Sequence, residues 1–228
     1  KQMKLCHVKC LYILCTWRTN NQYLSGKMFI FPRETNTAHV KLSPLKQNFN
    51  SVTVCQRFFT DLIRGHVHFS LATPSYSNTF LVYWDGTDKE FEISTMDTTG
   101  LFGVEDYKRN TWHSLCTTWD PVSGLVQLWL DGQPSVKKFT RSVSNIRGSL
   151  IIMLGQEQDS HGGGFDIKQS FVGMMYDVHM WDYVLSTCEI QNYMDYRSFT
   201  PGNVLNWRAM DYQIIGQVLL ENRAMVCL

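Results

Sequence analysis

The sequence has little excess charge of either sign and few charged residues overall. Its 228 residues include 21 Lys and Arg against 20 Asp and Glu, so the net charge is +1, and only 18% of residues are charged. This balance gives no electrostatic reason to expect a nucleic-acid site or a general membrane-surface binder. Because 44% of residues are hydrophobic and 13% aromatic, intrinsic disorder is excluded and a folded chain is expected.

Long hydrophobic runs are missing from the amino-terminal part of the chain. The longest uncharged apolar run there, residues 10–15 (CLYILC), has six residues. A membrane helix needs about 20 such residues and the apolar part of a signal peptide about 7–15, so no membrane span is predicted. We interpret residues 1–20 as an extension or signal remnant that is not part of the fold, and residues 21–228 as the folded domain.

Most of the remaining sequence consists of strand and turn signals. Four β-branched or aromatic runs are predicted to be strands, at residues 28–31, 52–59, 79–84 and 125–130. Asp131-Gly132 follows the last run and predicts a hairpin, because both residues tolerate the positive φ of a type I′ turn. No repeat and no flexible linker divides the chain, so one domain is favoured.

One helix signal interrupts the strands. Ser186 and Glu189 form a capping-box pattern in which each side chain is expected to bond the backbone amide of the other residue. Ile190, Tyr193 and Met194 follow as an apolar stripe, which predicts a helix of about three turns that ends near residue 196. Since one helix cannot build βαβ units, the expected fold is an all-β sandwich of two antiparallel sheets with one short helix.

The cysteines do not form a recognisable metal motif. None of the seven belongs to a C-x-x-C pair, and the spacing of Cys6, Cys10 and Cys15 does not match a zinc site. The other four are widely spaced along the chain: Cys55, Cys116, Cys188 and Cys227. Wide spacing in a β-rich chain favours an oxidising compartment over a cytosolic redox site.

An acidic, glycine-rich segment lies between Leu154 and Val172. It brings four oxygen-bearing side chains within thirteen residues, around three consecutive glycines: Glu157, Asp159, Asp166 and Gln169. Carboxylate and amide oxygens suit calcium, which accepts 6–8 oxygen ligands in irregular geometry. The spacing is not that of an EF-hand loop, and an acidic glycine-rich loop is often a solvated turn, so the pattern alone leaves both interpretations open.

Several segments resemble the pentraxin family. The matching segments are residues 25–34, Cys55, Asn78 with residues 81–83, residues 123–124, 128–129 and 131–132, residues 154–160 (LGQEQDS), residues 169–173, residues 180–182 and residues 203–207. Together they span about residues 22–225. The family pattern H-x-C-x-[ST]-W-x-[ST] is kept at Cys116, Thr118 and Trp119, whereas Ser114 and Pro121 depart from it.

The resemblance implies a flattened, lectin-like jelly-roll protomer that binds two calcium ions on one face. It also implies a secreted, extracellular, non-enzymatic homopentamer of innate immunity and the acute phase. Its expected ligands are phosphocholine, phosphoethanolamine or polysaccharides, and complement components are further expected partners. By motif, the first calcium site uses Asn78, Glu157, the Gln158 carbonyl and Asp159, and the second uses Glu157, Asp159, Asp166 and Gln169.

One departure from the family pattern affects the first site. Ser77 stands where the family usually has an Asp immediately before the residue that corresponds to Asn78. Three matched carboxylates then face two dications, so we expect calcium to bind more weakly at the first site.

The resemblance also implies an aromatic side chain beneath a choline group, with a carboxylate that pairs with the ammonium. Tyr83 matches the aromatic position, although it is equally consistent with a core or rim residue. The carboxylate position falls near Thr98 or Thr99, with Asp97 close by, so choline specificity stays open, as does recognition of phosphoethanolamine or of sulfated or carboxylated sugars.

The family's intrachain disulfide is implied to join Cys55 and Cys116, which are 61 positions apart. Cys188 and Cys227 are additions to the family pattern. They are expected either to form a second disulfide that ties the tail to the helix or to pair between subunits.

Parts of the sequence also suggest other functions. A glycosidase would use Glu157 and Asp159 as its acids, but the third acid of that motif would fall on Gly162. A structural or interaction protein with a weakened calcium site is a further alternative. His113 near Cys116 suggests Cys-His chemistry only weakly, and His66 and His68, without a third ligand, are usually surface or core residues. The basic residues Lys137, Lys138 and Arg141 suggest a small solvated edge.

Overall fold

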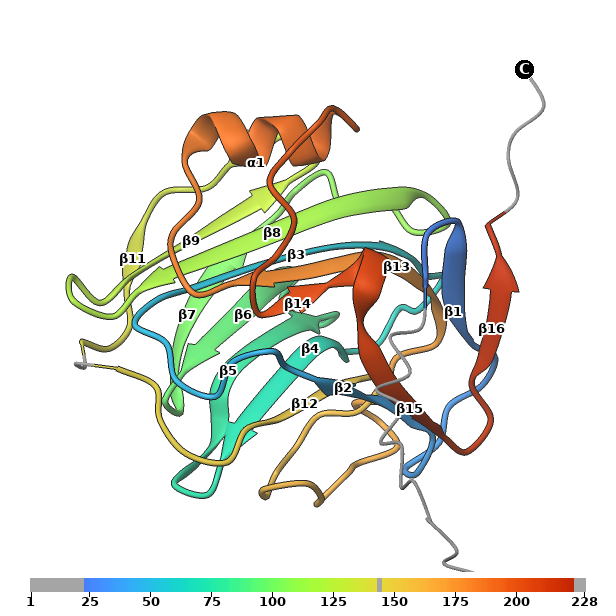
Figure 1. Cartoon of the computed structure of the whole chain (residues 1–228). Coiled ribbons are helices and arrows are strands. Elements are labelled where there is room, and N and C mark those ends of the chain that lie inside the picture. Colours follow the sequence, from blue (N-terminus) through green and yellow to red (C-terminus); the bar gives the residue numbers. More distant parts are fainter. Residues whose placement is uncertain (1–22, 143–144, 224–228) are drawn as a thin grey trace, which may run out of the picture.

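Two antiparallel β-sheets pack face to face in the computed structural model, which describes residues 23–142 and 145–223 (Figure 1). The nine-stranded sheet has the order β10-β9-β8-β3-β13-β1-β16, with β11 beside β9 and β14 beside β13. Its strands are β1 (Lys27–Phe31), β3 (Val52–Phe59), β8 (Trp112–Asp120), β9 (Leu125–Leu130), β10 (Gln133–Pro134), β11 (Lys138–Phe139), β13 (Gly173–Trp181), β14 (Leu205–Asn206) and β16 (Leu219–Asn222).

The seven-stranded sheet has the order β15-β2-β12-β4-β5-β6-β7. Its strands are β2 (His39–Ser43), β4 (His66–Thr73), β5 (Tyr76–Asp85), β6 (Glu90–Thr95), β7 (Thr98–Gly103), β12 (Ile151–Leu154) and β15 (Asp211–Ile215). A short 3-10 helix, η1 (Trp207–Ala209), precedes β15. The expected all-β sandwich is confirmed, while the predicted extension at residues 1–20 lies outside the described residues.

The local signals for strands and turns are reproduced in this architecture. The strand predicted at residues 52–59 coincides with β3. Asp131 and Gly132 have φ of 48° and 83° and join β9 to β10 in an antiparallel pair, so the predicted hairpin is confirmed. The strand predicted at residues 79–84 is longer than expected, because β5 already begins at Tyr76.

The hydrophobic core lies between the sheets and includes the fully buried side chains of Phe29, Phe69, Phe80, Phe91 and Trp119. Burying one large apolar side chain contributes about 1.5–3 kcal/mol, so these side chains are major contributors to stability. Strands alternate between the two faces of a sheet, and on β6 the buried residues alternate with the half-buried Glu90 and Glu92. The outer face of the seven-stranded sheet is therefore the face that carries polar side chains.

The single α-helix, α1 (Thr187–Met194), lies on the outer face of the nine-stranded sheet (Figure 1). It buries Ile190, Tyr193 and Met194, as predicted, in a cluster with side chains of the nine-stranded sheet such as Trp129 and Trp181. Within the described ranges, no helix is long and apolar enough to cross a membrane.

The ends of α1 differ in part from the prediction. The Ser186 hydroxyl accepts a hydrogen bond of 3.2 Å from the Glu189 N–H, as expected. The Glu189 carboxylate, however, accepts from the Thr200 N–H at 3.0 Å, so it serves the following segment instead of completing the capping box. The helix has eight residues and stops at Met194 instead of near residue 196, because Tyr196 adopts a left-handed φ of 57°.

Arg57 connects α1 to the sheet beneath it. Its side chain is 1% exposed, and its Nε donates to the Asp177 carboxylate at 3.2 Å. The two Nη groups donate to the Ser114 hydroxyl and the Tyr193 carbonyl. The guanidinium also lies 3.5 Å from the ring centroid of Tyr196. This one cation therefore joins β3, β8, β13 and the C-terminal end of α1.

A disulfide links Cys55 and Cys116, which face each other on the paired strands β3 and β8. The pairing implied by the family resemblance is confirmed, and a Cys-His role for Cys116 is wrong because its thiol is not free. Cys188 is exposed on α1. Its predicted partner, Cys227, lies outside the described residues, so a second disulfide stays a prediction.

Candidate functional site

The segment between β12 and β13, here called the 155–170 loop, is held against the outer face of the seven-stranded sheet (Figure 1). The Gln158 side-chain amide donates to the carbonyls of Ser70 at 3.3 Å and Ile151 at 3.2 Å, and its Oε1 accepts from the Gly162 N–H at 3.0 Å. A ligand role for Gln158 therefore rests on its backbone carbonyl, as the resemblance implies. Near its other end, the loop accepts a hydrogen bond of 2.9 Å from the Val67 N–H at the Gln169 carbonyl.

A tight turn folds the middle of the 155–170 loop back on itself. Ser160 and Gly163 exchange two backbone hydrogen bonds of 3.1 Å. Gly164 has a φ of 79°, and a Cβ there would lie only 2.8 Å from the Cβ of Asp159. Only glycine combines this conformation with so close an approach, so Gly164 allows the returning chain to pass beside Asp159.

Two hydrogen bonds join the backbone of Asn78, on β5, to Asp97 in the β6–β7 turn. The Asp97 carboxylate accepts from the Asn78 N–H at 2.8 Å, and the Asp97 N–H donates to the Asn78 carbonyl at 3.1 Å. Met96 and Asp97 have φ of 47° and 60°, which form the turn, and Arg141 donates to the Met96 carbonyl at 2.9 Å. Sequence reasoning named Asp97 only as a neighbour of Thr98 and did not place it beside Asn78.

Glu157 lies in an environment of negative charge. Its side chain is 3% exposed. Burial is the largest cause that raises the pKa of Glu157 to about 7, followed by the adjacent Asp159 carboxylate and by the charge of Asp97. Both burial and nearby carboxylates disfavour the ionised form. Asp97, Asp159 and Glu157 therefore interact electrostatically at one place, although they come from two separate parts of the chain.

Three predicted ligands have a buried oxygen with no hydrogen-bond partner in the described part of the chain. These atoms are Oδ1 of Asn78, Oε2 of Glu157 and Oε1 of Gln169. Leaving a buried polar atom unpaired costs about 1–3 kcal/mol, so such atoms call for a partner. The unpaired atoms are all oxygens, the type of donor that calcium prefers, so the chemistry of these residues fits that ion.

The structure links the predicted ligand Asp166 less directly to the rest of the candidate site. Asp166 is exposed, and its carboxylate accepts from the Lys168 N–H at 2.8 Å within a turn that also contains Gln169. In the described ranges, no hydrogen bond joins Asp166 to Glu157 or Asp159. Likewise, no group of three or more His, Cys, Asp or Glu side chains there is arranged to hold a metal ion. The candidate set thus depends on amide and carbonyl oxygens as well as carboxylates.

The pair His66 and His68, weighed as metal ligands, lies in the core. Both side chains are fully buried, and their ring centroids are 4.9 Å apart. Burial lowers the pKa of His66 to about 4 and that of His68 well below its usual value. The two residues are therefore neutral core histidines that pack against aromatic rings such as Phe171.

Tyr83 lies on the outer face of the seven-stranded sheet, between Val67 on β4 and Glu92 on β6. It is half-buried, and burial, followed by the charges of Asp85, Glu92 and Glu157, raises its pKa to about 12. The Tyr83 phenol lies above Gly65, where an added Cβ would be 2.2 Å from the hydroxyl oxygen, and the side chain also packs against the edge of the hydrophobic core. A role of Tyr83 in ligand contact stays a prediction.

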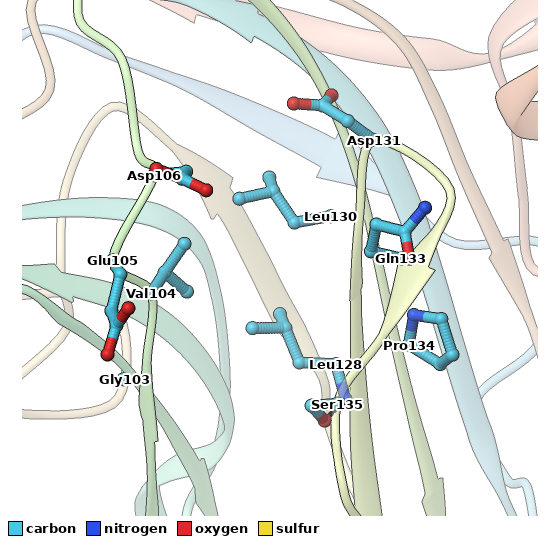
Figure 2. A pocket seen from close by; sticks show the side chains of 10 residues that line it. All are labelled: Gly103, Val104, Glu105, Asp106, Leu128, Leu130, Asp131, Gln133, Pro134 and Ser135. Atoms are coloured by element: carbon cyan, nitrogen blue, oxygen red, sulfur yellow. Dashed lines mark hydrogen bonds between the residues drawn. The ribbon is translucent and has the colours of Figure 1, made fainter.

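A separate pocket of about 340 Å³ lies between the segment that follows β7 and the β9–β10 hairpin. Figure 2 shows Val104, Leu128 and Leu130 pointing into it, with Asp106 and Asp131 near one end. None of the predicted ligand residues lines this pocket, so it is distinct from the candidate site.

Comparisons with known proteins agree with this architecture. A model described as the Pentaxin family matches residues 27–222. The chain is 38% identical to C-reactive protein of Mus musculus over 217 residues, which is 93% of this chain and 95% of that protein. It is also 38% identical to serum amyloid P-component of the same species over 201 residues, 88% of each chain.

A solved structure shares the fold. The native heptameric SAP-like pentraxin from Limulus polyphemus superposes with a TM-score of 0.80 at 23% identity, over 90% of this chain and 99% of that one. The family match over residues 27–222 and the relatives that are 38% identical over most of the chain show that the chain belongs to the pentraxin family.

Proposed function

We propose that the protein is an extracellular recognition protein of innate immunity that binds phosphate-bearing head groups or polysaccharides through two calcium ions. The observation that carries this proposal is the set of unpaired buried oxygens on Asn78, Glu157 and Gln169. The Cys55–Cys116 disulfide supports an oxidising, extracellular location. The family relationship supports a homo-oligomer, for which we expect five subunits.

Each group of residues has a distinct part in the proposed site. Asn78, Glu157, Asp159 and the Gln158 carbonyl would hold the first ion, and Glu157, Asp159, Asp166 and Gln169 the second, with Glu157 and Asp159 shared. Bound calcium would supply positive charge for an anionic oxygen of the ligand. The Gln158 side chain keeps the loop in place through Ser70, and Asp97 keeps Asn78 in place through its backbone.

Calcium titration followed by ligand binding tests this function. Isothermal titration of the protein with calcium should show two unequal sites, and Glu157→Gln should weaken both because its carboxylate is shared. A matched control is Glu221→Gln, which removes an exposed acid on β16, far from the loop in sequence. If the titration shows no calcium binding, a structural or interaction role is the remaining function.

A second measurement addresses the ligand. Calcium-loaded protein should be retained on phosphocholine or phosphoethanolamine beads and released by EDTA. Release of reducing sugar that is abolished by Glu157→Gln would instead support the glycosidase alternative. We favour binding over hydrolysis because Glu157 is 3% exposed, whereas a catalytic acid must reach the glycosidic oxygen.

A further inference from the structure

Two predicted ligands of the second calcium site, Asp166 and Gln169, belong to one turn, here called the 166–170 turn. The Asp166 carbonyl accepts from the Gln169 N–H at 3.0 Å, and the Ile167 carbonyl accepts from the Ser170 hydroxyl at 2.7 Å. Residues 166–168 are exposed, and only Ser170 is fully buried. A surface turn with so little burial keeps one conformation only if other parts of the protein hold its backbone.

Arg64, in the segment between β3 and β4, binds the backbone of the 166–170 turn. Its Nη1 donates to the carbonyls of Lys168 at 2.9 Å and Ser170 at 2.7 Å, on either side of Gln169. The same nitrogen donates to the Gly65 carbonyl at 3.0 Å, which holds the guanidinium against the start of β4. Nη2 donates to the Ser170 hydroxyl at 3.3 Å. One guanidinium therefore fixes the backbone from which the Gln169 side chain extends.

The Gln169 backbone is bonded on both sides while its side-chain oxygen is not. The Gln169 carbonyl accepts from the Val67 N–H at 2.9 Å, so the carbonyls of residues 168–170 are all bound by Arg64 or Val67. In the described part of the chain, the buried Oε1 of Gln169 has no hydrogen-bond partner. Because the backbone is held, this oxygen cannot easily turn away to find one, and a bound cation would satisfy it.

The positive charge of Arg64 is partly offset where it binds the turn. The Glu34 carboxylate lies 3.5 Å from Nη2 of Arg64 and 3.9 Å from Nζ of Lys168. An arginine without such a partner would repel a nearby calcium ion. Glu34 reduces this repulsion, so we expect the hydrogen bonds of Arg64 to matter more for calcium binding than its charge.

The same region also binds the start of the 155–170 loop. The Thr35 N–H donates to the Ser170 hydroxyl at 3.4 Å, and the Thr35 carbonyl accepts from the Gln156 side-chain amide at 2.7 Å. Both ends of the loop are therefore attached to residues 34–35 and 64, which come from two segments outside it. Since none of these bonds uses a predicted ligand atom, they do not require the ion.

We propose that Arg64 is a positioning residue of the second calcium site, which holds the 166–170 turn in the binding conformation before the ion arrives. This inference rests on the proposed function, because it concerns one of the two proposed sites. Ordering the ligands in advance lowers the entropy cost of binding. Loss of Arg64 should therefore weaken calcium binding and also loosen the turn in calcium-free protein.

Two variants of Arg64 separate its hydrogen bonds from its charge. Arg64→Lys keeps the charge but replaces the planar guanidinium by a single nitrogen, which cannot span the same acceptors, and Arg64→Met removes both. In isothermal titration with calcium, both variants should weaken the second site about 10- to 100-fold, as the loss of a residue that orients metal ligands does. Arg33→Lys, at an exposed arginine on a neighbouring segment, is the matched control and should bind calcium like the wild type.

The variant Asp166→Asn assigns the effect to one site. The calcium affinity that remains in this variant belongs to the first site, and adding Arg64→Lys should leave it unchanged, because Arg64 bonds none of the first-site ligands. If Arg64→Lys weakens binding as much in the Asp166→Asn background as in the wild type, Arg64 does not act through the second site and the inference is wrong.

Hydrogen exchange in EDTA measures the turn without the ion. The amides of Gln169 and Ser170 should exchange at least about tenfold faster in Arg64→Lys than in the wild type, while those of β8 keep their protection and show that the fold is intact. Glu34→Gln is a milder change at an exposed side chain. It should speed exchange of the same two amides to a smaller extent, which keeps the test decisive if Arg64→Lys does not fold.

The outcomes separate this inference from the proposed function. Wild-type protein that binds no calcium overturns both. If the wild type binds calcium but Arg64→Lys leaves either the calcium affinity or the exchange of the turn unchanged, the positioning role is wrong and the proposed function stands. Tighter calcium binding by Arg64→Met would show that the charge of Arg64 opposes the ion, and would also overturn the positioning role.

Discussion

The Asp97 carboxylate accepts a hydrogen bond of 2.8 Å from the backbone N–H of Asn78. The residue that precedes Asn78 is Ser77, where the family pattern usually has an acid. The charge of Asp97 also acts on Glu157. The Asp97 carboxylate therefore lies close to Ser77, the position where the family pattern has an acid and this chain has none. We therefore expect Asp97 to offset part of the negative charge that the first calcium site lacks.

Replacing Asp97 by Asn keeps an oxygen that can accept from Asn78 but removes the charge. We expect Asp97→Asn to weaken calcium binding at the first site about tenfold, because a single charge near a protein surface contributes on the order of 1–4 kcal/mol at short range. Isothermal titration measures the affinity. Asp88→Asn, in the exposed β5–β6 turn, is the matched control. Equal affinities for the wild type and Asp97→Asn would show that this charge does not act on the ion.

Restoring the missing acid should have the opposite effect. We expect Ser77→Asp to tighten the weaker of two unequal calcium sites, because it adds negative charge next to Asn78. The gain should be larger in the Asp97→Asn background, where no neighbouring carboxylate compensates. Calcium titration of the two single variants and the double variant gives the coupling between the positions. Two equal, tight sites that do not respond to Ser77→Asp would contradict the expectation.

The tight turn of the 155–170 loop depends on Gly164. We expect Gly164→Ala to reduce calcium affinity at least about tenfold, because both its φ of 79° and its contact with Asp159 exclude a side chain. The melting temperature without calcium should change little, since the loop lies outside the core between the sheets. Gly103→Ala, at an exposed position with no atom within 4 Å of the added Cβ, is the control. Unchanged calcium affinity in Gly164→Ala would show that the turn geometry is not needed.

The buried guanidinium of Arg57, beneath α1, leads to a prediction about stability. Arg57→Met should lower the free energy of unfolding by about 3 kcal/mol, because it removes the cation that bonds the Asp177 carboxylate and the Tyr193 carbonyl and leaves Asp177 with only its contact to His179. Arg197→Met removes an exposed pair with Asp195, whose N–O distance is 3.3 Å, and should cost less than about 1 kcal/mol. Urea unfolding measures both. Similar losses in the two variants would contradict the importance of the buried contacts.

His113 gives a prediction about pH. Burial lowers its pKa, but hydrogen bonds of 2.6 Å to the Asp131 carboxylate and the Lys108 carbonyl outweigh burial, so the pKa of His113 is raised. A group whose pKa is raised in the folded state adds stability that is fully present below its unfolded pKa of about 6.5. That contribution is lost as pH rises through the folded pKa.

The variant Asp131→Asn tests this dependence, because it keeps an oxygen acceptor and removes the charge. It should destabilise the protein by about 1 kcal/mol at pH of about 5.5, and by less at pH of about 8.5, where His113 is neutral. Denaturant midpoints of both proteins at the two pH values give the comparison. A loss that is the same at both pH values would show that the His113–Asp131 pair is not ionised in the folded protein.

Much of the fold follows from signals that are local in the sequence. The strand at β3, the Asp131-Gly132 hairpin and the cap at Ser186 each depend on residues a few positions apart, and all three were predicted. The end of α1 was not, because it depends on the left-handed conformation of Tyr196 and on contacts that Glu189 makes with the following segment. Such choices depend on tertiary packing and leave no local pattern.

The candidate site shows the same contrast between local and long-range signals. The proposed ligands within the 155–170 loop can be named from the sequence because they lie close together in one recognisable segment, and their role stays a prediction. Asp97 was not assigned to the site, since the pairing of β5 with β6 brings it beside Asn78, which lies 19 positions away in the chain. A shift of one residue in that pairing would separate Asp97 from Asn78, so no sequence pattern in the β6–β7 turn alone reveals this contact.

The disulfide between Cys55 and Cys116 closes a covalent ring around β4, β5, β6 and β7. Asn78, Tyr83, Glu92 and Asp97 all belong to this ring. One peptide-bond cleavage anywhere within it leaves a single molecule, because the two fragments stay joined through sulfur. A nicked protein would therefore migrate as an intact chain without reductant and separate into two fragments with it, while the nicked strands stay attached to the rest of the sheet.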